Sequence, residues 1–204
     1  MRRQLLPSII SMIIFTLLLG VGFPLLITGI GQVAFKDKAN GSLVQVDGKD
    51  VGSSLVGQSF TDKKGNPIPR YFQSRPSSAA GADGTTEAGY DPTLSSGSNL
   101  GPTNPDLLAA VAQRAKDYRE LNGLAAGAEV PVDAVTASGS GLDPDISVAN
   151  ARLQAKRVAD ERGLSEQQVL AQIDEHTSDR TLGILGEKTV NVLELNLALD
   201  RLKS

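Results

Sequence analysis

The stretch Leu5–Phe35 reads LLPSIISMIIFTLLLGVGFPLLITGIGQVAF and carries no charged side chain. Asp, Glu, Lys and Arg are absent from all 32 positions between Arg3 and Lys36. A helix of roughly 20 apolar residues crosses the hydrocarbon core of a bilayer, so this stretch is long enough to span it. The sequence therefore predicts a membrane anchor in residues 1–35, with the transmembrane span itself at about 7–33.

Two alternatives fit this stretch less well. A cleaved signal peptide has an apolar region of about 7–15 residues followed by a small-x-small cleavage site, whereas this stretch is much longer and Gly29-Ile30-Gly31 makes a poor site. A buried core helix of a soluble protein would need a second apolar stretch of this length to cover it, and the chain has none. We therefore expect one crossing, with residues 36–204 on one side of the membrane.

Charge bears on the orientation and on the partners of the chain. Arg2 and Arg3 precede the apolar stretch, and a short basic leader of this kind favours a cytoplasmic N-terminus with the bulk of the chain outside. Residues 36–204 carry 18 basic and 23 acidic side chains, a net charge near −5. Such a balance argues against nucleic acid or anionic lipid as the partner of this part. Cysteine is absent, which excludes disulfides, thiol catalysis and Cys-based metal sites.

Small and hydroxylated residues interrupt the apolar stretch. Such residues let helix backbones approach each other in a membrane, although they are also simply common in membrane helices. As candidate contacts with partner helices we take Ser11, Thr16, Gly20 and Gly22. Pro24 should kink the helix or end its regular part.

Residues 36–204 predict an α+β fold with a small sheet and several helices. Asp47-Gly48 between two apolar-rich runs predicts a β-hairpin. Tyr71–Pro76 suggests a short strand that ends at the proline, and Val130–Val135 a short buried strand or an extended entry. A Gly/Ser-rich segment at about 77–104 has no periodicity, and we expect an ordered surface loop there. Capping signals predict helices after Asn104, Ser147, Ser165 (with Gln168 completing a capping box) and Asn191, with glycine stops at Gly123 and Gly163.

Known catalytic patterns are incomplete in this chain. His176 is the only histidine, and no Gly-x-Ser-x-Gly elbow, Ser-x-x-Lys dyad or Walker loop occurs. Asp143 and Asp145 beside a glycine-rich turn could hold a hard cation, although a turn that leads into a capped helix explains them more simply. Leu94–Ser98 (LSSGS) loosely resembles the phosphate-contacting loop of transport ATPases. No cofactor-binding set is complete in the sequence.

Several longer motifs, taken together, resemble one protein family. They are Tyr71–Ser77 (YFQSRPS), Ser96–Pro105 (SGSNLGPTNP), Val132–Ser147 (VDAVTASGSGLDPDIS), Ala151–Ala159 (ARLQAKRVA) and the segment from Gly183 to Leu199. With the N-terminal anchor they are similar to the C subunit of the bacterial Kdp potassium-transporting ATPase, and the similarity extends to the C-terminus.

The resemblance implies a single-pass accessory subunit of an inner-membrane complex, with a periplasmic α+β domain. Its partners would be a channel-like subunit that selects K⁺, a P-type ATPase subunit that hydrolyses ATP, and a small single-span subunit, so that ATP, Mg²⁺ and K⁺ are handled by partner subunits. The family is also described as a catalytic chaperone that raises the ATP affinity of the ATPase subunit through its glycine/serine loop. That description makes Ser95, Ser96, Gly97, Ser98 and Asn99 candidate nucleotide contacts.

Three hypotheses follow from the residues and the resemblance. The first is an assembly and modulating subunit whose domain covers the extracellular K⁺ entrance, with Gln73, Arg75, Asp143 and Asp145 as candidate partner contacts. The second is a nucleotide-binding chaperone that acts from the cytoplasm. It conflicts with a domain outside the membrane, and Ser96 stands where that loop usually has glycine. The third, a free-standing envelope hydrolase, lacks a catalytic set.

Overall fold

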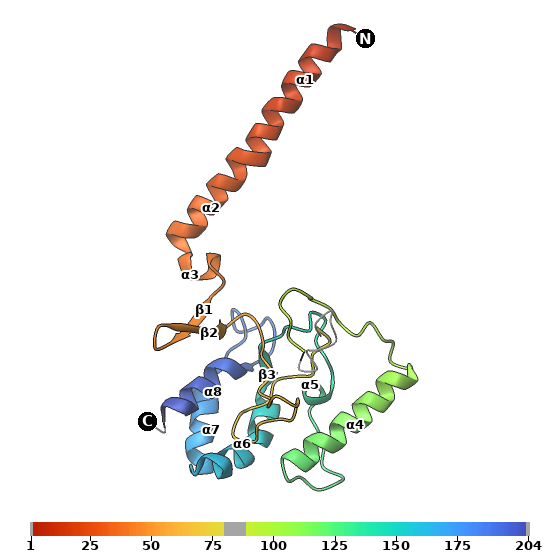
Figure 1. Ribbon diagram of the computed structural model, residues 1–204, viewed down its shortest axis with the longest axis vertical. Coiled ribbons are helices and arrows are strands. Elements are labelled where there is room, and N and C mark those ends of the chain that lie inside the picture. Colours follow the sequence, from red (N-terminus) through yellow and green to blue (C-terminus); the bar gives the residue numbers. More distant parts are fainter. Residues whose placement is uncertain (1, 80–88, 203–204) are drawn as a thin grey trace. The chain divides into compact units, whose positions relative to one another are not determined.

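The computed structural model describes residues 2–79 and 89–202 and divides the chain into two compact units, Met1–Val51 and Gly52–Ser204. The first unit contains the long N-terminal helix and most of a β-hairpin, and the second contains a mixed α+β domain (Figure 1). One long apolar helix followed by a domain of helices and a small sheet is the predicted α+β class, and that prediction is confirmed.

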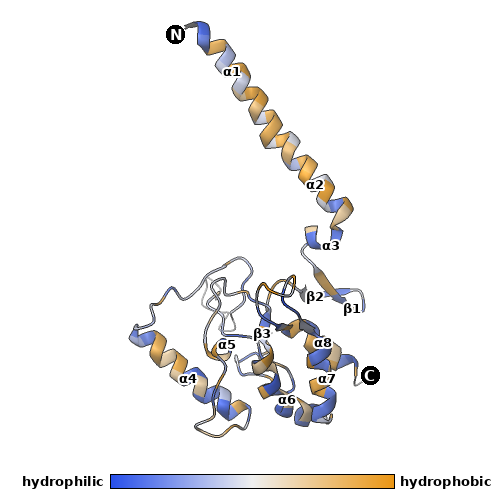
Figure 2. Ribbon diagram, turned by 180° about the vertical axis from the view of Figure 1, so that it is seen from behind, coloured by the Kyte–Doolittle hydropathy of each residue, from blue (hydrophilic) through white to orange (hydrophobic). Residues whose placement is uncertain are grey.

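The N-terminal helix is continuous over Arg3–Ala34, with a mean hydropathy of 2.5, and by length and composition it could cross a membrane. It consists of α1 (Arg2–Leu17), a π-helical segment η1 (Leu18–Gly22) and α2 (Phe23–Ala34). Figure 2 shows hydrophobic residues along nearly the whole length of this helix. None of the most apolar stretch of this helix is buried against the rest of the chain.

Pro24 interrupts the regular helix, as predicted. Proline has no N–H to donate, and its ring collides with the carbonyl four residues earlier, that of Gly20. The turn before it widens accordingly, and the N–H of Phe23 bonds to the carbonyl of Leu18, five residues back. A π-helical turn of this kind is one of the recognised causes of irregularity in long helices.

After a short helix α3 (Lys36–Ala39), the strands β1 (Leu43–Val46) and β2 (Lys49–Ser53) form the predicted hairpin. Asp47 and Gly48 both have positive φ, 52° and 73°. This backbone twist matches that of the flanking strands. Gln45 donates across the hairpin to Asp50 at 2.7 Å.

The second unit is built around α6 (Val148–Arg162), which packs against α7 (Glu166–Glu175). A three-stranded antiparallel sheet has the order β3 (Asp145–Ser147), β5 (Thr189–Asn191), β4 (Thr177–Ser178), and α8 (Val192–Arg201) follows β5. Apolar side chains from these elements form the core: Phe72, Ile146, Ala151, Ala155, Val158, Ala159, Val169, Ile173, Val190, Val192, Leu195 and Leu199. Figure 1 shows α4 (Pro105–Leu121) apart from α7 and α8.

The helix caps follow the predictions closely. The side chains of Asn104, Ser147, Ser165 and Asn191 each accept backbone N–H groups at the start of a helix, and Ser165 and Gln168 form the capping box. Gly163 ends α6 in the left-handed region. These caps depend on residues only a few positions apart, which is why the sequence predicts them.

Two suggested strands are wrong. Tyr71–Pro76 is extended but pairs with no strand in the part of the chain described, and Val132–Val135 is a short helix, α5. The described parts of the Gly/Ser-rich segment, 77–79 and 89–104, contain neither helix nor strand. The rest of that segment, residues 80–88, lies outside the described residues.

Candidate functional site

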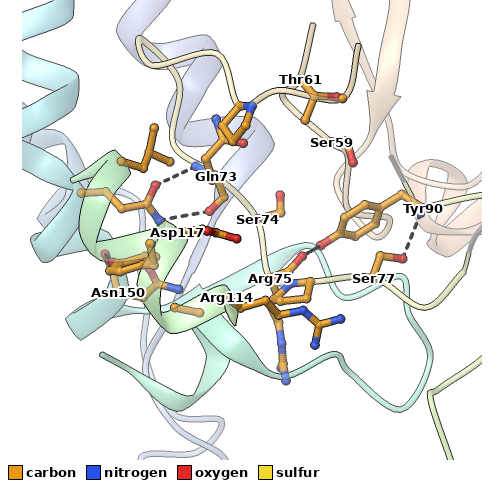
Figure 3. A pocket seen from close by; sticks show the side chains of 17 residues that line it. Ser59, Thr61, Gln73, Ser74, Arg75, Ser77, Tyr90, Arg114, Asp117 and Asn150 are labelled. Carbon is orange, nitrogen blue, oxygen red and sulfur yellow. Dashed lines mark hydrogen bonds between the residues drawn. The ribbon is translucent and has the colours of Figure 1, made fainter. Parts of the chain in front are cut away.

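A pocket of about 530 Å³ opens in the second unit between α4, the start of α6 and the extended segment Gln73–Ser77 (Figure 3). Its walls mix polar groups with aromatic and proline rings, so it can offer both hydrogen bonds and apolar contact. The residues that line it are Ser59, Thr61, Gly65, Pro67, Gln73, Ser74, Arg75, Pro76, Ser77, Tyr90, Arg114, Asp117, Tyr118, Leu121, Ala134, Asn150 and Gln154.

Two side-chain amides hold the extended segment in place. Asn196 accepts from the N–H of Phe72 at 2.8 Å and donates to its carbonyl at 3.0 Å. Gln154 does the same for Gln73, at 2.7 and 3.1 Å, as the dashed lines of Figure 3 show. A buried backbone group without a partner is costly, so these amides replace the neighbouring strand that the segment lacks.

One face of α6 continues this polar structure inside the domain. Asn150, Gln154 and Arg157 follow one another at helical spacing, and all three are buried. The oxygen of Asn150 accepts from Tyr118 and from Gln154, each at 2.9 Å, while Arg157 donates to the oxygen of Gln154 at 2.8 Å. Burial lowers the pKa of Arg157 to about 10, so its guanidinium stays charged at neutral pH. Burial raises the pKa of Tyr118, which therefore acts as a neutral donor.

Asp133 on α5 ties this face of α6 to the pocket wall. Its carboxylate accepts from the N–H of Ser147 at 2.7 Å, from the Ser147 hydroxyl at 2.9 Å and from the Asn150 amide at 3.0 Å. A negative charge at a helix N-terminus is stabilising because the helix dipole is positive there. These contacts, between residues 14 to 17 positions apart, fix Val132–Val135 as a helical turn rather than a strand.

Three of the four predicted partner-contact residues in this domain lie close together. Arg75 and Asp143 form an ion pair at 2.7 Å, and both side chains keep part of their surface exposed, 22% and 30%. Gln73 and Arg75 line the pocket, and the side chain of Gln73 donates to three backbone carbonyls. Asp145 is directed elsewhere, since it begins β3 and accepts from Thr189 and Asn191.

Tyr90 fixes the other end of the extended segment. Its hydroxyl donates to the carbonyl of Arg75 at 2.7 Å, and its N–H donates to the Ser77 hydroxyl at 2.9 Å (Figure 3). Burial raises the pKa of Tyr90 to about 12. Gly57 lies against its ring, because a Cβ placed on this glycine would collide with it.

The Ser95–Asn99 loop packs against the glycine-rich turn at 138–141 and does not line the pocket. The N–H of Ser96 donates to the carbonyl of Ser140 at 2.9 Å, and the Ser95 hydroxyl contacts the same carbonyl at 3.2 Å. A Cβ on Gly97 would lie 3.1 Å from the carbonyl of Gly139, so the two loops touch through their backbones. Ser98 and Asn99 are exposed.

The predicted contacts on the N-terminal helix belong to the first unit. Ser11 and Thr16 lie on α1, Gly20 and Gly22 lie in the π-helical segment, and all four are exposed. They stay predictions of contact with partner helices.

The sequence did not single out Tyr90, Tyr118, Asn150, Gln154 or Arg157 as site residues. A signal exists for the last three, since polar residues at i, i+4 and i+7 alternate on α6 with Ala151, Ala155 and Val158. Polar side chains inside an otherwise apolar helix face require partners, which points to a buried network. The backbone groups that Gln154 and Arg157 bind lie more than 80 residues away in the sequence, so the sequence pattern does not identify them.

The described residues contain no group of three His, Cys, Asp or Glu side chains placed to hold a metal ion. His176 ends α7, where its Nδ1 lies 2.9 Å from the carbonyl of Gln172. The pocket presents hydrogen-bonding groups and the guanidinium of Arg114, and the Arg75–Asp143 ion pair lies beside it.

One N-terminal helix apolar enough to cross a membrane, joined to an α+β domain with a polar pocket, defines a class of proteins with a single candidate membrane span. Comparison with known proteins specifies the class further. The chain belongs to the family described as "K+-transporting ATPase, c chain", whose model matches residues 5–201.

Known relatives match over nearly their full length. The potassium-transporting ATPase KdpC subunit of Mycobacterium tuberculosis (strain ATCC 25618 / H37Rv) is 56% identical over 202 residues, which cover 99% of this chain and 100% of that protein. The KdpC subunit of Caulobacter vibrioides (strain NA1000 / CB15N) is 50% identical, over 98% of this chain and 94% of the relative. That of Koribacter versatilis (strain Ellin345) is 48% identical, over 98% and 95%. These matches confirm the resemblance drawn from the sequence motifs.

Proposed function

We propose that this chain is the accessory, non-catalytic subunit of a high-affinity, ATP-driven K⁺ uptake complex, required for the assembly of the complex and for modulating its activity. The observation that carries the proposal is the full-length match to the c chain of K⁺-transporting ATPases. Its partners would be a channel-like K⁺-selecting subunit, a P-type ATPase subunit and a small single-span subunit, which handle K⁺, ATP and Mg²⁺.

The N-terminal helix supports a role as a membrane anchor. A single helix cannot enclose an ion path, and this one has no ionisable side chain between Arg3 and Lys36 that could relay an ion or a proton. None of its most apolar stretch is buried against the rest of the chain, which suits contact with lipid and with partner helices. In the proposal, residues 1–35 are the anchor of a single-pass subunit of the cytoplasmic membrane, the N-terminus is cytoplasmic and residues 36–204 lie outside.

The domain supports a binding role rather than a chemical one. The chain has a single histidine, the commonest general base, and no cysteine that could supply a thiol nucleophile. The polar groups of the pocket are largely engaged in holding the extended segment and the start of α6. In the proposal, Gln73, Arg75 and Asp143 contact a partner subunit, and the net charge near −5 mildly concentrates cations near the K⁺ entrance.

The proposal assigns nucleotide binding to the ATPase subunit. A phosphate-binding loop needs free backbone N–H groups that converge on the anion. In the Ser95–Asn99 loop the N–H of Ser96 already donates to Ser140, and Gly97 is closed against Gly139. These contacts favour a structural role for the loop over the alternative in which it raises the ATP affinity of the partner.

Purification of the complex with and without this chain tests the proposal. We expect that membranes lacking the chain yield a complex that loses a subunit on detergent extraction, or that loses K⁺-stimulated ATPase activity. Re-expression of the full chain should restore both properties. An intact complex with unchanged K⁺-stimulated ATPase activity in the absence of the chain would exclude the proposed role.

A further inference from the structure

One face of α4 brings two opposite charges to the pocket of the second unit. Four residues of this helix line the pocket, and their positions i, i+3, i+4 and i+7 lie on a single face. They are Arg114, Asp117, Tyr118 and Leu121. Figure 3 shows the first two at the pocket wall. This wall therefore combines a guanidinium and a carboxylate with an aromatic ring and an aliphatic side chain.

The guanidinium of Arg114 keeps unused hydrogen-bond donors. The side chain is half-buried, and among the described residues its hydrogen bond runs from Nη1 to the carbonyl of Val135, at 3.1 Å. A guanidinium carries five N–H donors and stays charged in proteins. Its partner within the described chain is thus a neutral carbonyl, and most of its donors remain available to a ligand.

A second guanidinium on the pocket wall also lacks an acceptor. Arg75 donates from Nη1 to Asp143 at 2.7 Å, whereas its Nε is buried and has no hydrogen-bond partner in the part of the chain described. Buried donors without a partner are rare in native proteins, and each calls for a water, an ion or a ligand. The two arginines therefore favour a ligand that brings acceptor oxygens.

Asp117 adds a requirement of the opposite sign. It follows Arg114 by one helical turn, and one of its oxygens accepts from the Gln113 side chain at 2.7 Å. Side chains three positions apart on a helix have Cβ atoms roughly 5–6 Å apart, so a ligand that reaches Arg114 also lies close to Asp117. Asp117 would repel a ligand that is only anionic, and Arg114 one that is only cationic. A ligand that carries both charges close together satisfies both residues.

We propose that this pocket binds a free amino acid, whose carboxylate pairs with Arg114 and whose ammonium group pairs with Asp117. An amino acid carries these two charges on a single carbon atom. The pocket volume of about 530 Å³ lies within the range of roughly 300–1,000 Å³ that is typical of small-molecule sites. This volume leaves room for a side chain, which Tyr118 and Leu121 would contact. The inference adds a ligand to the proposed accessory subunit and does not depend on which partners the chain has.

Thermal unfolding of the full chain in mild detergent tests the binding, with each of the standard L-amino acids added in turn at millimolar concentration. A ligand that binds only the folded state raises Tm by mass action. We expect at least one amino acid to raise Tm. Two compounds matched to it, one without the amino group and one without the carboxylate, should raise Tm much less. No increase with any amino acid, or an equal increase with either matched compound, overturns the inference.

Two variants separate binding in the pocket from the general stabilising effect of small solutes. Arg114→Gln keeps a donor for Val135 but removes the positive charge, so it should weaken binding by about tenfold or more and abolish the preference over the compound without a carboxylate. Asp117→Asn alters an exposed side chain, so it should fold normally and abolish the preference over the compound without an amino group.

The matched controls are Lys116→Gln and Glu120→Gln, which remove one charge of each sign from α4 at exposed positions outside the pocket. Both should bind the amino acid as the unaltered chain does. Equal binding by all four variants, or an equal loss in all four, overturns the inference.

Discussion

At the scale of single residues, the domain depends on buried polar side chains that bind distant parts of its backbone. Arg162 is fully buried at the end of α6, where it donates to the carbonyl of Arg70 at 2.7 Å and to Asp200 at 2.8 Å. Its guanidinium also lies 5.1 Å from the centre of the Tyr71 ring. A buried charge is tolerated only with partners of this quality. These interactions tie the turn at Arg70 to the end of α6 and to α8.

Gln154 joins the extended segment to the buried polar face of α6. Gln154→Ala removes the acceptor of the Gln73 N–H and of Arg157, and the donor to the Gln73 carbonyl. Each buried group left without a partner costs about 1–3 kcal/mol, so we expect a loss of about 2–4 kcal/mol of unfolding free energy. Denaturant unfolding of the full chain in mild detergent measures it. Gln167→Ala, at an exposed position of α7, is the control and should change the free energy by less than about 0.5 kcal/mol.

The ionisation of Tyr90 should lower the free energy of unfolding at alkaline pH. Burial raises its pKa from 10 to about 12, so the folded state retains a proton that the unfolded state releases. The stabilisation is therefore complete below pH 10 and is lost as the pH rises from 10 to about 12. Tyr118 contributes in the same direction.

Unfolding of the full chain at a series of pH values should show this decline, and Tyr90→Phe should make it shallower. The variant also lacks the hydroxyl bond to Arg75 and should lose about 1 kcal/mol at pH 7. An equally steep decline in the variant would show that Tyr90 is not its source.

At the scale of elements, the sequence correctly predicted the features that depend only on residues close together in the chain. The hairpin at Asp47-Gly48, the caps at Asn104 and Ser147 and the stop at Gly163 are all local devices, and each is confirmed. The extended segment at Tyr71–Pro76 was misjudged because its partners are amides on α6 and α8, 81 to 124 residues away. The pocket could not be predicted for the same reason, since its walls come from six separate parts of the chain.

Two glycines at element ends should respond differently to alanine. Gly57 lies where a Cβ would come within 2.6 Å of the carbonyl of Asp143 and collide with the Tyr90 ring, so Gly57→Ala must displace the pocket wall. We expect a loss of about 2–3 kcal/mol. Gly163 has open space around it and only a positive φ of 66°, so Gly163→Ala should cost about 1 kcal/mol. Equal losses in denaturant unfolding would show that space around Gly57 is not the deciding factor.

At the scale of the whole molecule, the chain combines a helix with no charge after Arg3 and a domain with an excess of acidic groups. Between its first and last turns a helix pairs its backbone groups internally, which is the requirement for crossing lipid. Placing a charge at its centre costs about 2.5–3.5 kcal/mol on insertion scales, and the sequence avoids every such residue between Arg3 and Lys36. The helix, as the proposed anchor, therefore suits lipid, whereas the charged domain suits water.

The proposed orientation follows from the basic leader before the helix and can be measured with single cysteines. Because the chain has no cysteine, Gln4→Cys and Gln167→Cys each carry one thiol, before the apolar stretch and on the exposed face of α7, and both keep Arg2 and Arg3. With a cytoplasmic N-terminus, a membrane-impermeant maleimide added to intact spheroplasts should label position 167 at once and position 4 only after permeabilisation. The long C-terminal part can be translocated whatever its charge, so the Arg2-Arg3 leader decides the outcome. Labelling of position 4 but not of 167 would place the domain in the cytoplasm, where contact with ATP becomes open to it again.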